Sequence, residues 1–338
     1  MQQRNPAFDI MKGIAVLLMV WEHCNLHLLP YEHAFIYSFH MPLFFLLGGY
    51  FAKDVYSFDG FWVTTKKNAR RLLLPYAVTF ILLILWGFIQ SVLKHDWSLV
   101  MRYVITLFWA SGDAWEYTSG LVTAGPTWFL IALFWTREIF YSIQVLANKL
   151  SSKYREVIVV GTCLILSLAA KFIYPHAQPL PFGILPGITA LIFYAIGWLV
   201  HKHTIPWYII AICVICWPFT IYHDGIELYE CQYSFPLDIF GACGGTYIIY
   251  KLCDALCAFN NKYSWLHKSP IFLKWCGMYS LPILCMHTFE THSGILWSFK
   301  CRFPFEMGAD AMMWARILAA LFFACLVINI PILKKVYK

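Results

Sequence analysis

The chain has 338 residues, of which 60% are apolar and only 13% are charged, whereas about 25% charged residues is usual for a water-soluble protein. This composition excludes a soluble globular protein, so we expect a membrane protein. One membrane span takes about 20 apolar residues, and ten spans would leave no room for a large soluble domain. The net charge of +7 comes from 25 Lys and Arg against 18 Asp and Glu. In a membrane protein, the distribution of these charges between the two sides of the membrane is more informative than the net charge.

Ten apolar runs are long enough to cross a bilayer. In chain order they cover residues 10–29, 34–52, 72–93, 125–147, 156–174, 183–200, 205–222, 235–253, 270–289 and 311–332. A further run, 99–110, is too short to cross, so we predict a short interfacial or re-entrant helix there. We therefore predict an all-α integral membrane protein in which residues 1–338 form a single domain of about ten transmembrane helices.

The cations indicate how these helices are oriented. With an even number of spans, both termini lie on one face, and that face collects most of the 25 Lys and Arg residues. Positive residues concentrate on the cytoplasmic side of membrane proteins. We therefore predict that both termini and the loop at 53–71 are cytoplasmic, and that 24–33, 94–124 and 290–310 face outward.

The first predicted helix holds four ionisable groups, which should face protein or water because lipid exposure is costly. Lys12 and His23 are eleven residues apart, so they share one face of the helix about 16 Å apart along its axis. Asp9 is placed to pair with Lys12, whereas Glu22 lies about 100° from His23 and cannot be assumed to be its partner. The alternative is a lysine that snorkels to the headgroups and a histidine bonded inside the bundle.

The second predicted span carries another histidine, His40, in the outer part of a helix that runs antiparallel to the first. Gly48 and Gly49 allow another backbone to approach closely, and Pro42 frees a backbone carbonyl for another partner. Two histidines at similar depth predict a polar centre in the bundle.

These motifs resemble those of a known family. A basic residue, ten intervening residues and a histidine on the first span, followed by the histidine and glycine motifs of 39–51, resemble the membrane acyltransferase 3 family, particularly its fucose 4-O-acetylase-like branch. Three further segments resemble the family's motifs in the same order, at 67–76, 125–130 and 277–287, and the last of them ends in His287, a weaker site candidate. The family most often has arginine where this chain has Lys12.

The resemblance implies an enzyme that moves an acyl group, in the first instance acetyl, from cytoplasmic acyl-CoA to a hydroxyl on a cell-envelope glycan or a lipid-linked sugar. Acyl-CoA carries several phosphate charges and needs a cationic entrance on the cytoplasmic side. The candidates for binding it are Lys12, Lys67, Arg70 and Arg71. The ordinary positive-inside signal is the alternative explanation for such cations.

His23 is the first candidate for catalysis, because a neutral histidine can take the proton of a hydroxyl near pH 7. Alternatively, it carries the acyl group briefly as acyl-histidine. His40 would orient His23 or help to bind the acceptor, with a purely structural role as the alternative.

Four further residues are candidates for binding the substrate, namely Glu22, Trp128, Tyr279 and Ser280. Aromatic belts at the membrane interface are the alternative for Trp128 and Tyr279, and Ser280 can bond within the bundle. Cys213 and Cys216 have zinc-like spacing but lack a second Cys or His pair in a polar loop, so we expect no metal.

The expected donor is acetyl-CoA or another acyl-CoA. The expected partners are this donor, a glycan or lipid-linked sugar acceptor and membrane lipids, with no nucleic acid and with a homodimer as an option. The expected location is the bacterial inner (plasma) membrane, which the chain would cross many times.

Two other classes of function compete with the enzyme. A proton-coupled transporter or exporter of a small polar or envelope substrate would use intramembrane Lys, Glu and His residues to relay protons or bind substrate. Against it, the sequence shows neither a repeated half nor a matched pair of broken helices. A structural scaffold would leave Lys12, His23 and His40 without a reason to be there.

Overall fold

A computed structural model describes residues 5–23, 30–112, 122–174, 180–262, 268–294 and 309–337. Within these residues the fold is helical, and the only β pairing is an isolated bridge between Glu227 and Gln232. The segment at 24–29 and parts of the predicted outer segments 94–124 and 290–310 lie outside the described residues.

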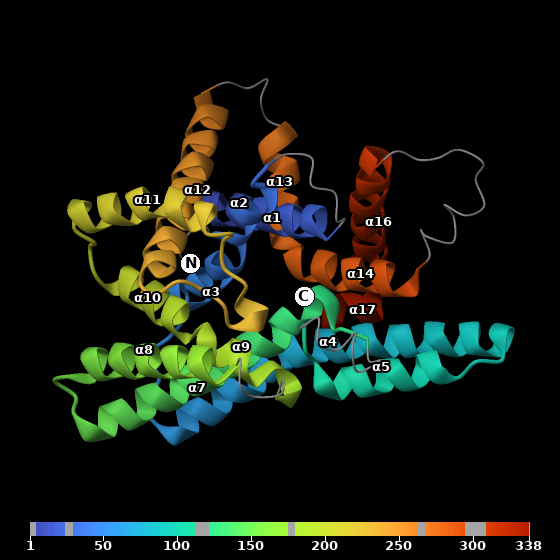
Figure 1. Cartoon of the computed structure of the whole chain (residues 1–338), viewed down its shortest axis with the longest axis horizontal. Helices are drawn as coiled ribbons and strands as arrows, with labels where there is room; N and C mark the ends of the chain where they lie inside the picture. The colour runs from blue at the N-terminus through green and yellow to red at the C-terminus, as the bar shows by residue number, and fades with distance from the viewer. Residues whose placement is uncertain are drawn as a thin grey trace.

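The elements in chain order are α1 (Pro6–Glu22), α2 (Glu32–Tyr37), α3 (His40–Tyr50), α4 (Phe58–Lys94), α5 (Ser98–Trp109), η1 (Gly125–Thr127), α7 (Trp128–Leu150), α8 (Arg155–Ile173), η3 (Pro181–Gly183), α9 (Ile184–Thr189), α10 (Leu191–Lys202), α11 (Trp207–Tyr222), η4 (Leu228–Glu230), α12 (Leu237–Lys262), α13 (Lys268–Met278), α14 (Ser280–Ser293), α16 (Ala309–Asn329) and α17 (Pro331–Val336). Figure 1 shows α1 in the middle of the molecule, with α10, α11 and α12 on its left and α14 and α16 on its right. Helix α1 packs against α3, α12, α13, α14 and α16.

Part of the predicted membrane architecture is present. Among the described residues, 3 helices are long and apolar enough to cross a membrane, at Phe58–Lys94, Gly125–Leu150 and Arg155–Ile173. The pair Pro181–Thr189 and Leu191–Lys202, bent by 49°, makes a fourth if it counts as one span. The all-helical class is therefore confirmed, whereas the number of ten spans and the orientation of the termini stay predictions.

Besides the bent pair α9 and α10, two more predicted spans are broken helices. The predicted span 34–52 forms α2 and α3, which are interrupted at Ser38 and Phe39. The Ser38 hydroxyl donates to the carbonyl of Phe35 at 2.7 Å and accepts from the indole of Trp217 at 2.8 Å. The predicted span 270–289 forms α13 and α14, which are interrupted at Tyr279. The short predicted helix at 99–110 is present as α5, with 12 residues.

Helix α4 begins earlier than the sequence predicts. The segment 53–71 was expected to be a loop, but the helix starts at Phe58 and has 37 residues. Its N-terminus is capped by Ser57, whose hydroxyl accepts from the Gly60 amide at 3.2 Å. At 1.5 Å per residue the helix is about 55 Å long, well beyond a hydrocarbon core of about 30 Å. A helix of this length can extend beyond the membrane into water. Its charged residues can therefore be exposed to water without being in a loop.

Several pairs of helices cross at glycines, with almost no side chain between their backbones. A Cβ added to Gly277 of α13 would collide with the carbonyl of Asp9 on α1, and one added to Gly13 would collide with the carbonyl of Leu273. At the crossing of α3 and α10, a Cβ on Gly49 would collide with the Tyr194 carbonyl. The predicted close approach at the glycines of the second span is thus confirmed, and such contacts are typical of helix packing in membranes.

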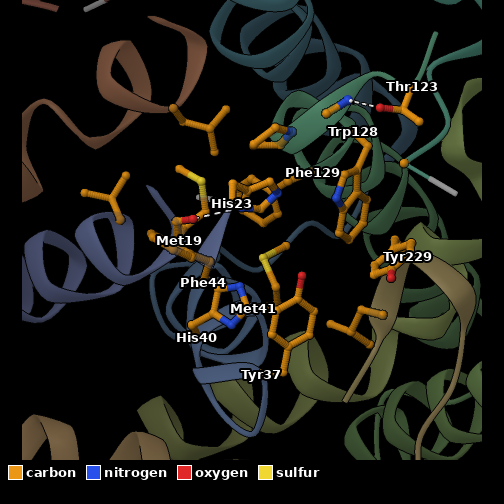
Figure 2. Close-up of a pocket in the computed structure, with 16 residues that line it drawn as sticks. Met19, His23, Tyr37, His40, Met41, Phe44, Thr123, Trp128, Phe129 and Tyr229 are labelled. Carbon is orange, nitrogen blue, oxygen red and sulfur yellow. Dashed lines mark hydrogen bonds between the residues drawn. The ribbon is translucent and has the colours of Figure 1, made fainter. Parts of the chain in front are cut away.

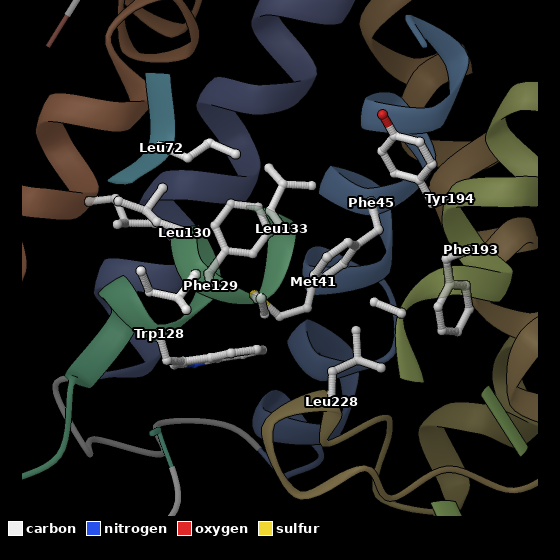
Figure 3. Packing of buried hydrophobic residues seen from close by; sticks show 14 of the residues in the cluster. Met41, Phe45, Leu72, Trp128, Phe129, Leu130, Leu133, Phe193, Tyr194 and Leu228 are labelled. Atoms are coloured by element: carbon white, nitrogen blue, oxygen red, sulfur yellow. The ribbon is translucent and has the colours of Figure 1, made fainter. Parts of the chain in front are cut away.

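The apolar core lies beside α3 and α7. Figure 3 shows Met41 and Phe45 of α3 packed against Phe129 and Leu133 of α7. The rings of Phe45 and Phe129 meet edge to face, with 5.3 Å between their centroids. This core fixes α3 relative to the start of α7, where Trp128 begins the helix.

Candidate active site

A cavity of 260 Å³ lies where α1, α2 and α3 meet the start of α7. The residues that line it are Val16, Met19, His23, Tyr37, His40, Met41, Phe44, Gly112, Thr123, Gly125, Pro126, Trp128, Phe129, Leu228, Tyr229 and Leu284. In Figure 2, His23 and His40 lie on one side of this cavity, and Trp128 and Tyr229 lie on the opposite side. The structure therefore brings together three of the site residues that were predicted from sequence.

Each cavity histidine is held by its own segment of backbone. His23 follows the last residue of α1, and its Nδ1 lies 2.8 Å from the carbonyl oxygen of Met19. His40 is the first residue of α3, and its Nδ1 lies 2.8 Å from the carbonyl oxygen of Ile36. Because a carbonyl oxygen only accepts hydrogen bonds, Nδ1 carries the proton in both neutral rings. Nε2 therefore has the free lone pair that a general base needs.

Lys12 lies on the stripe of α1 that leads to the cavity. Val16, Met19 and His23 follow it at helical spacing, and all three line the cavity. The Lys12 Nζ lies 2.9 Å from Oδ1 of Asp9, which is the ion pair expected from the sequence. Lys12 itself is not among the lining residues, and it lies at the end of the stripe that is far from His23.

Glu22 belongs to a clamp at the edge of the cavity rather than to its lining. The Nδ1 of His33 donates to Oε1 of Glu22 at 2.5 Å, and Nε2 of His33 lies 3.6 Å from Oε1 of Glu227. The hydrogen bond to Glu22, followed by the contact with the Glu227 carboxylate, raises the pKa of His33 to about 9. The charged ring stacks on Tyr37 at 4.1 Å, and Tyr37 lines the cavity. Glu22 therefore helps to position a cavity residue.

The other predicted site residues lie away from the cavity lining. Tyr279 is at the break between α13 and α14, where its ring packs against Trp275 with 5.2 Å between centroids, and Ser280 begins α14. Lys67, Arg70 and Arg71 are exposed on the first half of α4.

A buried polar network adjoins His23. The ring of His287 on α14 is completely buried, and its centroid lies 5.7 Å from that of His23. The Nδ1 of His287 lies 3.3 Å from Oε2 of Glu290. Arg316 of α16 lies with its Nε 3.3 Å from Oε1 of Glu290, and its Nη1 donates to the His23 carbonyl at 2.9 Å. The network thus encloses His23 from two further helices.

Sequence reasoning treated His287 as a weak candidate and missed Glu290 and Arg316. The available signal was that two ionisable residues, His287 and Glu290, interrupt one apolar helix three residues apart. Their link to His23 depends on the packing of α1, α14 and α16, and no spacing within the sequence indicates it.

The described residues contain no group of three or more His, Cys, Asp or Glu side chains that could hold a metal ion. Cys213 and Cys216, which have zinc-like spacing, are free thiols on α11. That the reaction needs no metal stays a prediction.

Comparison with known proteins identifies the family. The acyltransferase 3 family, described as "Acyltransferase domain", matches residues 5–334. The chain belongs to the acyltransferase 3 family. Within the curated proteins, Nodulation protein NolL of Sinorhizobium fredii (strain NBRC 101917 / NGR234) is 37% identical over 82 residues. That match covers 21% of this chain and 22% of the relative, and no solved structure matches the chain. The acyltransferase 3 family consists of membrane acyltransferases. Because the family matches nearly the whole chain, the resemblance seen in the sequence motifs is confirmed.

Proposed function

We propose that this acyltransferase moves an acetyl or related acyl group from acyl-CoA to a hydroxyl of a cell-envelope glycan or lipid-linked sugar. The observation that carries the proposal is the convergence of His23 and His40 on one cavity, each with Nδ1 bonded to a carbonyl and Nε2 free. Aromatic residues opposite them, Trp128 and Tyr229, offer apolar faces against which a sugar ring can lie.

In the proposed reaction His23 acts as the base. Its Nε2 takes the proton of the acceptor hydroxyl, and the hydroxyl oxygen attacks the carbonyl carbon of the thioester. The carbon–sulfur bond then breaks, and the imidazolium of His23 returns the proton to the sulfur of CoA. The products are an ester and a free thiol, and no net proton is consumed. His40 serves to bind or orient the acceptor.

The network around His23 supports this role. During the reaction the ring of His23 becomes positively charged, and the carboxylate of Glu290 lies one side chain away, beyond His287. Arg316 holds the carbonyl of His23, which fixes the end of α1. A catalytic group held in this way loses little free energy to reorientation in the transition state.

The donor would enter from the end of α1 that bears Lys12. In this proposal the termini are cytoplasmic, the protein lies in a bacterial inner membrane, and CoA approaches along the stripe from Lys12 to His23. Lys67, Arg70 and Arg71 would attract the phosphates of CoA from the exposed start of α4.

The test is transfer of radiolabelled acetyl from acetyl-CoA by the purified protein in lipid nanodiscs. The acceptor in this assay is the glycan and lipid-linked sugar fraction of the producing cell's envelope. We expect label in this fraction and free CoA in equal amount. If acetyl-CoA is not consumed while sealed vesicles that contain the protein accumulate solute with proton flow, the protein is a transporter and the proposal is wrong.

A further inference from the structure

A second cavity lies beside the catalytic one. Its volume is 680 Å³, and it is formed by the connection between α11 and α12 together with the end of α8. The residues that line it are Lys171, His223, Asp224, Gly225, Glu227, Glu230, Cys231, Gln232, Tyr233, Ser234 and Asp238. Its lining is thus rich in carboxylates, whereas that of the catalytic cavity is mainly apolar and aromatic.

The two cavities share a wall. Leu228 and Tyr229 in the single turn η4 line the catalytic cavity, and their neighbours Glu227 and Glu230 line the second cavity. One turn of backbone therefore separates the two spaces. A chain-like molecule that passes this turn can contact both cavities at once.

The sizes of the cavities indicate how an acceptor would be divided between them. Sites for small ligands usually enclose about 300–1,000 Å³. At 260 Å³ the catalytic cavity falls below this range, and it must hold the thioester as well as the reacting hydroxyl. The second cavity, at 680 Å³, lies well inside the range and can hold the parts of the acceptor that do not react.

The charges in the second cavity favour an uncharged ligand with many hydroxyls. Four carboxylates line it, namely Asp224, Glu227, Glu230 and Asp238, against one lysine and one histidine, His223, and the charge of Glu227 is partly offset by His33. That lysine, Lys171, already donates to the carbonyl of Tyr233 and lies over its ring. An anionic ligand would meet this excess of negative charge, whereas sugar hydroxyls can donate hydrogen bonds to carboxylates.

Asp238 offers a carboxylate oxygen in this cavity to which a ligand can donate a hydrogen bond. The residue is 1% exposed, and one carboxylate oxygen, Oδ2, accepts from the backbone amide of Ser234. Its other oxygen, Oδ1, is buried without a hydrogen-bond partner, and so is the hydroxyl of the neighbouring Thr220. A buried acceptor that lacks a partner is costly, and a ligand hydroxyl would remove that cost.

We propose that the second cavity binds the sugar units next to the one that is acylated, as uncharged units rich in hydroxyls. The identification of these units as part of the acceptor rests on the proposed function. The cavity would then hold the glycan in place, so that the reacting hydroxyl reaches His23 on the other side of η4.

The test uses the purified full chain in nanodiscs, without acyl-CoA, on immobilised tetrasaccharides. Three sets serve as probes, built from neutral hexoses, from uronic acids and from amino sugars. We expect binding to members of the neutral set, and about tenfold weaker binding or worse for Asp238→Asn and for Asp224→Asn, since each removes a charge-assisted hydrogen bond. Asp59→Asn, the same change at an exposed position at the start of α4, should bind as the wild type does.

The variants keep the test decisive. Asp224 is exposed and has a φ of 65°, a conformation that Asn tolerates well, so Asp224→Asn should fold even if Asp238→Asn does not. Unchanged binding by Asp224→Asn, binding to the uronic-acid or amino-sugar set in place of the neutral set, or no binding to any set would overturn the proposal. Acetyl transfer is measured separately. Transfer without glycan binding refutes this inference alone, whereas binding without transfer refutes the proposed function alone.

Discussion

Lys12 connects the donor side of the proposed reaction to the cavity. Its ammonium is paired with Asp9 at 2.9 Å, and it lies one turn before Val16 on the stripe that ends at His23. Lys12→Ala should raise the Michaelis constant for acetyl-CoA more than that for the acceptor, because Lys12 lies on the proposed path of the donor. Lys12→Arg should keep activity, since arginine preserves the charge. Unchanged affinity for acetyl-CoA in calorimetry, combined with a lower melting temperature, would mean that Lys12 only holds the end of the helix.

His33 is expected to make the protein less stable as the pH rises into the alkaline range. Its hydrogen bond to Glu22 and its contact with the Glu227 carboxylate raise its pKa from 6.5 to about 9. A raised pKa means that its stabilisation is fully present below pH 6.5 and is lost as the pH rises through about 9. We therefore expect the melting temperature of the wild type to fall more steeply than that of His33→Gln between about pH 6 and about pH 10. Parallel curves for the two proteins would contradict this role.

The sequence indicated the neighbours of a charged residue only where they lie within a turn or two of it. The pair of Asp9 and Lys12 was predicted from its spacing and is confirmed at 2.9 Å. Glu22 could not be assigned a partner, because His33 reaches it from another helix after an intervening turn. Arg316 is 293 residues from the carbonyl of His23 that it binds, a distance at which helical periodicity carries no information.

The crossing of α1 and α13 fixes the helix that bears His23. We expect Gly277→Ala to lower the stability by about 1–3 kcal/mol or more, because the new methyl group would collide with the Asp9 backbone and the helices would have to separate. Gly161→Ala on α8 is the matched control. A Cβ there meets nothing within 4 Å, so this change should be neutral or stabilise by about 0.4–1 kcal/mol. Thermal unfolding in detergent measures both, and equal effects would contradict the proposed crossing.

Hydropathy predicted the positions of the apolar helical segments, but it did not predict where α4 begins or where two of the predicted spans are interrupted. The apolar runs located the helical segments, and the short helix α5 was recognised as too short to span. The start of α4 was missed because charged residues were taken to mark a loop, although a helix can continue into water with them exposed. The breaks at Ser38 and Tyr279 were missed because each lies within an apolar run of spanning length, and hydropathy does not indicate where a helix is interrupted.

The orientation of the protein decides from which side each substrate arrives. The distribution of cations predicts cytoplasmic termini and an external face for 94–124. On a cysteine-reduced background, Asp59→Cys should resist an impermeant thiol reagent in intact cells and react after the membrane is opened. An introduced cysteine at Asp96, between α4 and α5, should react in intact cells. Labelling of the first and protection of the second would reverse the orientation and the proposed donor path.

Acyl transfer through His23 is tested most directly by the initial rate of labelled acetyl transfer in the wild type and in His23→Ala. His201→Ala serves as the control, because that histidine is exposed at the end of α10, where its ring packs against Tyr50. We predict that His23→Ala loses about 100-fold or more of the rate while its melting temperature stays near that of the wild type, since a general base contributes that much. The control should retain its rate. Retention of more than about a tenth of the wild-type rate by folded His23→Ala would contradict the role of His23 in the reaction.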